Sequence, residues 1–239
     1  MKLRNVLYDT HPLVVHAHGP HQMKPQWPEI HDAFFATPAR RLGPVPDLTV
    51  VTCNNGHAAM GLLERSLAHL GVPFLVGGGG VDPWVNSRDK PRAILELLAR
   101  VETPYVLYAD SRDAILVDDP GIALTRLREA FDCRLLFGAD RINWPHVKAF
   151  KAFEESIEGS DNVGKFRYLN GGAWLGERDF CREFFQQALE TPPVPEASES
   201  EQGILKKLFP QYYPDVQLDY RCAIIQNLGF VVSPVMAVE

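Results

Sequence analysis

The stretch PYVLYADSRDAIL, residues 104–116, joins an apolar strand to a pair of carboxylates. Its first part is rich in β-branched, aromatic and aliphatic residues, which is typical of a buried strand. Asp110 ends this strand, and Asp113 follows three residues later. Two carboxylates at a strand-to-loop corner can converge on one hard divalent cation. The alternative is that Asp113 caps the following turn and that Asp110 is only the polar end of a strand.

Strands and helices alternate on both sides of this stretch. Short apolar runs predict strands, and segments with apolar residues at helical spacing separate them. Asp119 followed by Pro120 predicts a helix start, Gly71 predicts a helix end, and Ser198 with Glu201 forms a capping-box pattern. This alternation is typical of a mainly parallel α/β sheet flanked by helices. Strands are predicted in 48–53, 72–77, 104–110, 133–140 and 168–176, and helices in 57–71, 90–101, 118–131, 177–190 and 198–209.

Ligands of such sheets bind beyond the carboxyl ends of the strands, which here are Thr52, Asp110 and Asp140. Lys90 heads a predicted helix and could neutralise a phosphate, or it could be a solvated lysine of the first turn. Trp144 could form the floor of a sugar or base site, or belong to the core. The glycine run 77–80 lacks the spacing of known phosphate-binding loops and predicts a flexible loop.

Three histidines occur near the start of the chain, in VVHAHGPH, residues 14–21. His16 and His18 are two positions apart, so on an extended strand they lie on one face, and His21 follows in a loop. Imidazole is a good ligand for Mn²⁺, Fe and Zn²⁺, although each histidine could equally be a surface or hydrogen-bonding residue. The pair also fits a metal-dependent hydrolase, but such proteins normally have metal-binding histidines on later strands, and none follows His146.

Composition restricts the function classes further. The net charge of -6 argues against a general nucleic-acid binder. Four widely spaced cysteines, without a C-x-x-C pair, predict reduced thiols in a cytoplasmic protein. The first residues contain no apolar stretch typical of a signal peptide, and the chain has no run of about 18 apolar residues, so we expect no membrane span.

Five motifs, in the order YADSRDAIL, FGADRINWP, YLNGGAWLG, SEQ and LDYRCAIIQNL, together resemble the glycosyltransferase domain of the procollagen lysyl hydroxylases. The resemblance covers most of residues 48–228 and keeps the order and approximate spacing of the motifs. It implies a GT-A fold, a mixed and mostly parallel sheet flanked by helices, which uses Mn²⁺ and a UDP-sugar. In that family a histidine segment follows the last of these motifs, whereas a similar segment here, RNVLYDTHPLVVHAHGP, occupies residues 4–20.

We therefore predict a single, circularly permuted domain over residues 1–239. Residues 1–25 would contain the final strand and the metal histidine, 26–47 the connector, 48–228 the main body, and 229–239 one half of a cut hairpin. Chain ends that lie close together make such a permutation tolerable. A truncated tandem array of such domains would give the same sequence.

The resemblance also implies roles for individual residues. Asp110, Asp113 and His16 would hold Mn²⁺. The nucleotide would be bound by five residues, namely Thr52, Lys90, Arg112, Gly19 and Lys24. The catalytic residue stays open, with Glu201, Asn170 and Trp144 as candidates on the sugar and acceptor side.

Three departures from the family concern the uridine, phosphate and acceptor contacts. Arg112 replaces a tyrosine, Lys24 is shifted by two residues, and 199–201 replaces an aspartate run. The predicted function is transfer of a hexose, glucose or galactose, from a UDP-sugar to an unidentified protein or glycan acceptor. The alternatives are the hydrolase with a His16 and His18 pair and a sugar-nucleotide binding module without turnover.

Overall fold

The computed structural model describes residues 1–157 and 165–239, and its centre is a six-stranded sheet of order β4-β3-β5-β8-β7-β9. Neighbouring strands are parallel from β4 to β5 and between β7 and β9, whereas β8 runs antiparallel to both of its neighbours. This confirms the predicted mixed α/β sheet, mostly parallel with one reversed strand. The strands are β3 (Leu48–Cys53), β4 (Phe74–Gly77), β5 (Tyr105–Ala109), β7 (Leu135–Asp140), β8 (Tyr168–Glu177) and β9 (Val216–Asp219).

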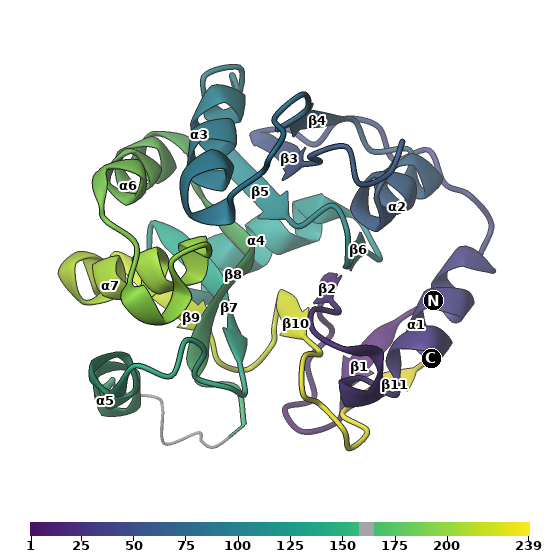
Figure 1. Ribbon diagram of the computed structural model, residues 1–239. Coiled ribbons are helices and arrows are strands. Elements are labelled where there is room, and N and C mark those ends of the chain that lie inside the picture. Colours follow the sequence, from purple (N-terminus) through teal and green to yellow (C-terminus); the bar gives the residue numbers. More distant parts are fainter. Residues whose placement is uncertain (158–164) are drawn as a thin grey trace.

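Two small sheets combine segments from opposite ends of the chain. Strand β2 (Val14–His16) lies between β10 (Ile225–Asn227), to which it is parallel, and β6 (Ala114–Leu116), to which it is antiparallel. Strand β1 (Leu3–Asn5) pairs antiparallel with β11 (Met236–Val238), so the two chain ends lie side by side (Figure 1). The first residues are therefore built into the fold beside the last.

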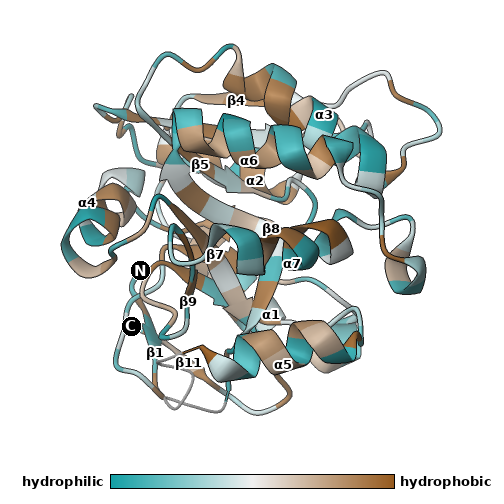
Figure 2. Ribbon diagram, turned by 90° about the vertical axis from the view of Figure 1, so that its left-hand side faces the viewer, coloured by the Kyte–Doolittle hydropathy of each residue, from teal (hydrophilic) through white to brown (hydrophobic). Residues whose placement is uncertain are grey.

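Helices cover the central sheet, and α3, α6 and α7 group together along one side of it (Figure 1). Their amphipathic sequences place apolar residues toward the sheet and polar residues outward (Figure 2). Helix α4 contacts β3, and α2 contacts β6. The helices are α1 (Trp27–Phe35), α2 (Leu62–Leu70), α3 (Asn86–Leu98), α4 (Pro120–Ala130), α5 (Lys148–Ser156), α6 (Arg178–Glu190) and α7 (Glu201–Tyr212), with 3₁₀ turns η1 (His21–Met23) and η3 (Pro195–Ala197).

Helix ends follow local chemistry, with two differences from the sequence-based expectation. Helix α4 begins as predicted, because Asp119 accepts a hydrogen bond from the Gly121 amide, and α2 ends at Gly71 with φ +68°. Helix α7 is capped by Ser200 rather than Ser198, since the Ser200 hydroxyl accepts from the Gln202 amide. Helix α3 begins four residues before Lys90, which moves that lysine out of the first turn.

The predicted connector 26–47 also differs from a plain loop, because its first part forms α1. Trp27, Ile30 and Phe34 recur at helical spacing and are buried in the main core. Their burial attaches the N-terminal segment to the body of the domain. The remainder of this stretch, from residue 36 to β3, carries no helix.

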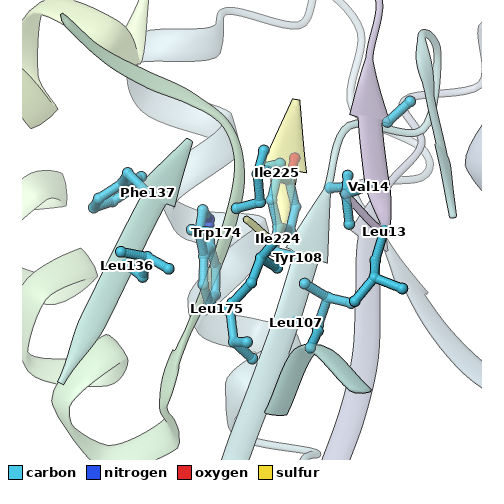
Figure 3. Close-up of a cluster of buried hydrophobic side chains, with 14 of the residues drawn as sticks. Leu13, Val14, Leu107, Tyr108, Leu136, Phe137, Trp174, Leu175, Ile224 and Ile225 are labelled. Carbon is cyan, nitrogen blue, oxygen red and sulfur yellow. The ribbon is translucent and has the colours of Figure 1, made fainter. Parts of the chain in front are cut away.

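The core lies directly beneath the carboxylate corner. Tyr108 stacks on Trp174 across β5 and β8, with ring centroids 5.3 Å apart and an interplanar angle of 11° (Figure 3). Leu107 and Leu175, the adjacent pair on the same strands, lie on the opposite face of the sheet, and all four side chains are buried. Interiors of this kind are close-packed and resist local displacement. The packing of Tyr108 against Trp174 therefore holds the end of β5 in place.

Two further expectations concern cysteines and membranes. All four cysteines are free thiols. Within the described ranges 1–157 and 165–239, no helix combines the length and apolar character needed to cross a bilayer.

Candidate metal and nucleotide site

Asp110, Asp113 and His16 converge at the carboxyl end of β5. The His16 Nε2 atom lies 3.7 Å from Asp110 Oδ2 and 3.3 Å from Asp113 Oδ1. One ligand atom from each residue falls within 4.8 Å of the others. Strand register explains the meeting, because β2 pairs with β6 so that His16 lies opposite Ala114, the residue after Asp113. The structure thus brings together the three residues that were predicted to bind metal.

His16 is oriented by Asn227 on the neighbouring strand β10. Its Nδ1 atom lies 2.8 Å from Asn227 Oδ1, and because a carbonyl oxygen only accepts, Nδ1 carries the proton. The Nε2 atom is then left buried without a hydrogen-bond partner among the described residues. Asn227 lies in the motif IIQNL, but nothing in this motif indicates that the asparagine orients a histidine.

The electrostatics of this cluster favour a positive charge. Burial alone would lower the pKa of His16, but the negative charges of Asp113 and Asp110 raise it to about 9. Burial would raise the pKa of Asp113, yet His16 keeps it below its ordinary value. A lone pair on Nε2 that faces two carboxylates is satisfied by a proton or by a metal ion. The residues therefore fit a divalent cation of the Mn²⁺ type, which accepts imidazole and carboxylate together.

Asp110 is held by groups on its other side. Its Oδ1 atom accepts from the Tyr108 hydroxyl at 2.7 Å and lies 2.8 Å from the Lys90 ammonium. Lys90 also donates to Glu201 at 2.6 Å. These contacts occupy Oδ1 and leave Oδ2 facing His16. Lys90 is buried, so the alternative of a solvated first-turn lysine is wrong.

The turn between the two aspartates is braced from beneath. Ser111 donates to the buried carboxylate of Glu64 at 2.7 Å, and Asn54 donates to the same oxygen at 2.9 Å. The Ser111 carbonyl accepts from the Leu63 amide at the start of α2. Buried and fully paired networks of this kind rigidify a site.

Two cavities meet at the metal cluster and share the side chains of Asn86, Lys90, Asp110 and Asp113. The first, of about 290 Å³, lies toward the ends of β3 and β5 and is completed by Cys53, Asn55, His57, Trp84, Tyr108, Ser111 and Arg112. The second, of about 450 Å³, lies toward β7 and β8 and is completed by His16, His18, Gly19, Pro20, Asp140, Ile142, Trp144, Asn170, Gly172, Ser200, Glu201, Gln202 and Phe230. A ligand that spans both cavities would pass directly over the two aspartates.

The five residues predicted to bind the nucleotide fall into two groups. Arg112 and Lys90 line the first cavity, and Gly19, with φ +78°, lines the second. Thr52 lies outside both groups, because its buried hydroxyl donates to the Ala109 carbonyl and it lines neither cavity. Lys24 also lines neither cavity, and its ammonium donates to the carbonyls of Ala17 and Gly19.

The candidates for the sugar and acceptor side all line the second cavity. Trp144 is 44% exposed there, whereas Asn170 and Glu201 are buried and paired. Asn170 donates to Asp140 at 3.0 Å, and Glu201 is paired with Lys90. None of these contacts by itself identifies a catalytic group.

Gly172 on β8 allows His16 to approach the cluster. A Cβ atom at this position would lie 2.0 Å from His16 Cε1, which is far inside van der Waals contact. We expect Gly172→Ala to displace the imidazole and to weaken Mn²⁺ binding by about 10- to 100-fold, as for lost orienting contacts at metal sites. Isothermal titration with MnCl₂ measures this change, and an unaltered affinity would show that His16 contributes little to the cation.

Comparisons with family models and with curated proteins find no match. Similar solved structures include two of glucosyl-3-phosphoglycerate synthase from Mycobacterium tuberculosis. One is 15% identical with a TM-score of 0.43, over 90% of this chain and 78% of that chain. The other, in complex with Mn²⁺, UDP and phosphoglyceric acid, is 18% identical with a TM-score of 0.43, over 95% of this chain and 78% of that chain.

The class of fold follows from the chain itself. The sheet order, with β8 as its reversed strand, defines the mixed, mostly parallel α/β fold that the sequence led us to expect, and the carboxylate corner lies at the end of β5.

Proposed function

We propose that this chain is a Mn²⁺-dependent glycosyltransferase that transfers a hexose, glucose or galactose, from a UDP-sugar to an acceptor hydroxyl. The observation that carries the proposal is the position of Asp110, Asp113 and His16 at the junction of two cavities. A UDP-sugar also has three parts in a row, namely the nucleoside, the diphosphate and the sugar, and these match the first cavity, the metal cluster and the second cavity. Its diphosphate would lie at the cation, its base in the first cavity and its sugar in the second.

Each part of the site would have a distinct task. Asp110, Asp113 and His16 would hold Mn²⁺, which supplies neutralisation of the diphosphate charge as UDP departs. Arg112, exposed at the first cavity, would stack on uracil or pair with a phosphate. Lys90 would fix the orientation of Asp110, because its ammonium lies between that carboxylate and Glu201.

The hydrolase alternative required His16 and His18 on one metal. The two rings lie 5.0 Å apart, but they face different carboxylates. His18 Nε2 lies 2.9 Å from Asp140 Oδ2, and His18 is absent from the metal cluster found among the described residues. This arrangement favours the glycosyltransferase proposal.

The permuted chain order remains part of the proposal. It is supported by the pairing of β1 with β11, which joins the two predicted halves of a hairpin. It is also supported by the place of β2 between β10 and β6, which delivers His16 to the aspartates. The single-domain boundaries remain a prediction.

The proposal is tested with a thermal-shift panel. UDP, UDP-glucose and UDP-galactose are compared with and without Mn²⁺, and sugar release from the best donor is then followed. Joint stabilisation by Mn²⁺ and nucleotide, together with sugar release, is expected. Stabilisation without turnover would favour the binding-module alternative, and no joint stabilisation would contradict both.

His16→Ala and His21→Ala form a matched pair within one segment. His16 is buried at the aspartates, whereas His21 lies exposed in η1. We expect His16→Ala to weaken Mn²⁺ binding by at least about tenfold and His21→Ala to leave it unchanged. Titration with MnCl₂ compares the two, and equal effects would argue against the metal assignment of His16.

A further inference from the structure

A second polar pair, His18 and Asp140, lies beside the metal cluster and outside it. His18 Nε2 is 2.9 Å from Asp140 Oδ2 and is buried, while the side chain as a whole is 20% exposed. The exposed part of the ring therefore belongs to its other atoms. Nδ1 has no hydrogen-bond partner among the residues for which the structure gives side chains, so it is the ring nitrogen left to meet a ligand.

Asp140 is fixed as a carboxylate by several donors. Besides facing His18, it accepts from the Asn170 amide at 3.0 Å and from the Arg141 backbone amide at 2.6 Å. Burial alone would raise its pKa, but His18 and these donors together keep the pKa of Asp140 below its ordinary value. With Nε2 buried against this carboxylate, Nδ1 is the ring nitrogen that remains for a hydrogen bond with a ligand.

The backbone leaves space for this histidine in a specific way. A Cβ atom on Gly229 would lie 1.9 Å from His18 Cε1 and 2.3 Å from its Nε2. The ring therefore packs against the bare backbone of residue 229, as His16 packs against Gly172. The contact fixes the plane of the imidazole independently of the metal ligands.

The surroundings of the pair indicate the kind of ligand. Trp144 is 44% exposed and Phe230 is 37% exposed, and both line the second cavity with His18. Exposed aromatic faces suit the apolar face of a sugar ring or an aromatic group.

The charged side chains on the same walls are the carboxylates of Asp110, Asp113, Asp140 and Glu201 and the cations Lys90 and His16. The Lys90 ammonium lies between Asp110 and Glu201, and His16 Nε2 faces Asp110 and Asp113. A phosphate or carboxylate on the acceptor would therefore find neither of these cations free to pair with it.

We propose that His18 and Asp140 bind the reacting hydroxyl of an uncharged acceptor held between Trp144 and Phe230. The inference rests on the proposed glycosyltransferase function and adds the acceptor site and its chemical class. Nδ1 of His18 forms a hydrogen bond with the hydroxyl, and Asp140 is a positioning residue that acts through the ring. The hydroxyl oxygen is thereby directed toward the junction of the two cavities.

Three variants and one control test the site. His18→Ala removes the ring, Gly229→Ala displaces it, Asp140→Asn removes the charge that faces its Nε2, and His21→Ala changes an exposed histidine of the same segment. Each protein is first assayed for stabilisation by Mn²⁺ with UDP, which reports the donor site. Transfer to 4-nitrophenyl glycosides and to 3-phosphoglycerate is then measured, together with sugar release to water, using UDP-glucose and UDP-galactose.

We expect transfer to the uncharged glycosides, and a fall of about 10- to 100-fold in kcat/KM for transfer in the three variants, the range for a lost hydrogen bond in a charged pair. Stabilisation by Mn²⁺ with UDP should persist in them, and the ratio of transfer to sugar release should fall. Preference for 3-phosphoglycerate, no use of any glycoside probe, or an equal fall in transfer and sugar release would overturn the proposal. If Mn²⁺ and UDP together did not stabilise the unaltered protein, that result would instead refute the glycosyltransferase function itself.

Discussion

Asp113→Asn should abolish the joint stabilisation of the protein by Mn²⁺ and UDP. Asp113 faces His16 Nε2 at 3.3 Å and lines both cavities, so its charge lies where cation and diphosphate would meet. A ligand at 100 times its Kd stabilises the folded state by about 2.7 kcal/mol. For a domain of this size that corresponds to a Tm increase of about 5 to 10 °C, which the variant should lose.

The control for this experiment is Asp132→Asn, which removes an exposed carboxylate that lines neither cavity. It should keep the full Tm increase, so that a general effect of charge is separated from a local one. Asp110→Asn should behave like Asp113→Asn, and it should in addition disturb Lys90 and Tyr108, which both contact Asp110. A full Tm increase in both site variants would contradict the metal assignment.

The two aspartates could be predicted from the sequence because their information is local. A buried strand that ends in Asp110, followed by Asp113 after a short turn, fixes both carboxylates at one corner whatever the rest of the fold does. His16 was reached only through the resemblance to a family, since its meeting with the aspartates depends on β2 pairing with β6 across a hundred residues. The hydrophobic periodicity of a segment does not reveal which distant strand it pairs with, or in which register.

The contacts that could not be predicted from the sequence share one physical cause. Thr52 does end a strand, but its hydroxyl is used by the neighbouring strand at the Ala109 carbonyl. Lys90 was assigned to a first turn, but α3 begins earlier and buries it between two carboxylates. The pair of His18 and Asp140 joins segments far apart in the chain. In each case the partner of the side chain, rather than its type, decides its role.

Lys206→Met should destabilise the protein more than any surface substitution. The Lys206 ammonium lies 2.8 Å from Glu154 Oε2, and the two side chains are 0% and 1% exposed. Lys206 also donates to Asn143 at 2.6 Å, next to Trp144, while Glu154 accepts from the Leu169 amide of β8. Removal of one partner from a buried pair leaves an uncompensated charge and costs about 3 to 5 kcal/mol.

Denaturant unfolding of Lys206→Met, with Lys207→Met as the exposed neighbouring control, measures this loss. The double variant Lys206→Met with Glu154→Gln should regain much of it, because glutamine keeps an oxygen for the Leu169 amide without the buried charge.

The loss in free energy of unfolding caused by Lys206→Met should also depend on pH. Burial raises the pKa of Glu154, and Lys206 opposes that rise. Without Lys206 the folded-state pKa of Glu154 rises further above its ordinary value of 4.5. A group whose folded pKa is raised contributes stability that is present below the ordinary pKa and is lost as pH increases through the raised value. The variant should therefore lie nearer the parent protein at pH 5 than at pH 8, and a deficit that is equal at both would show that Glu154 does not carry the uncompensated charge.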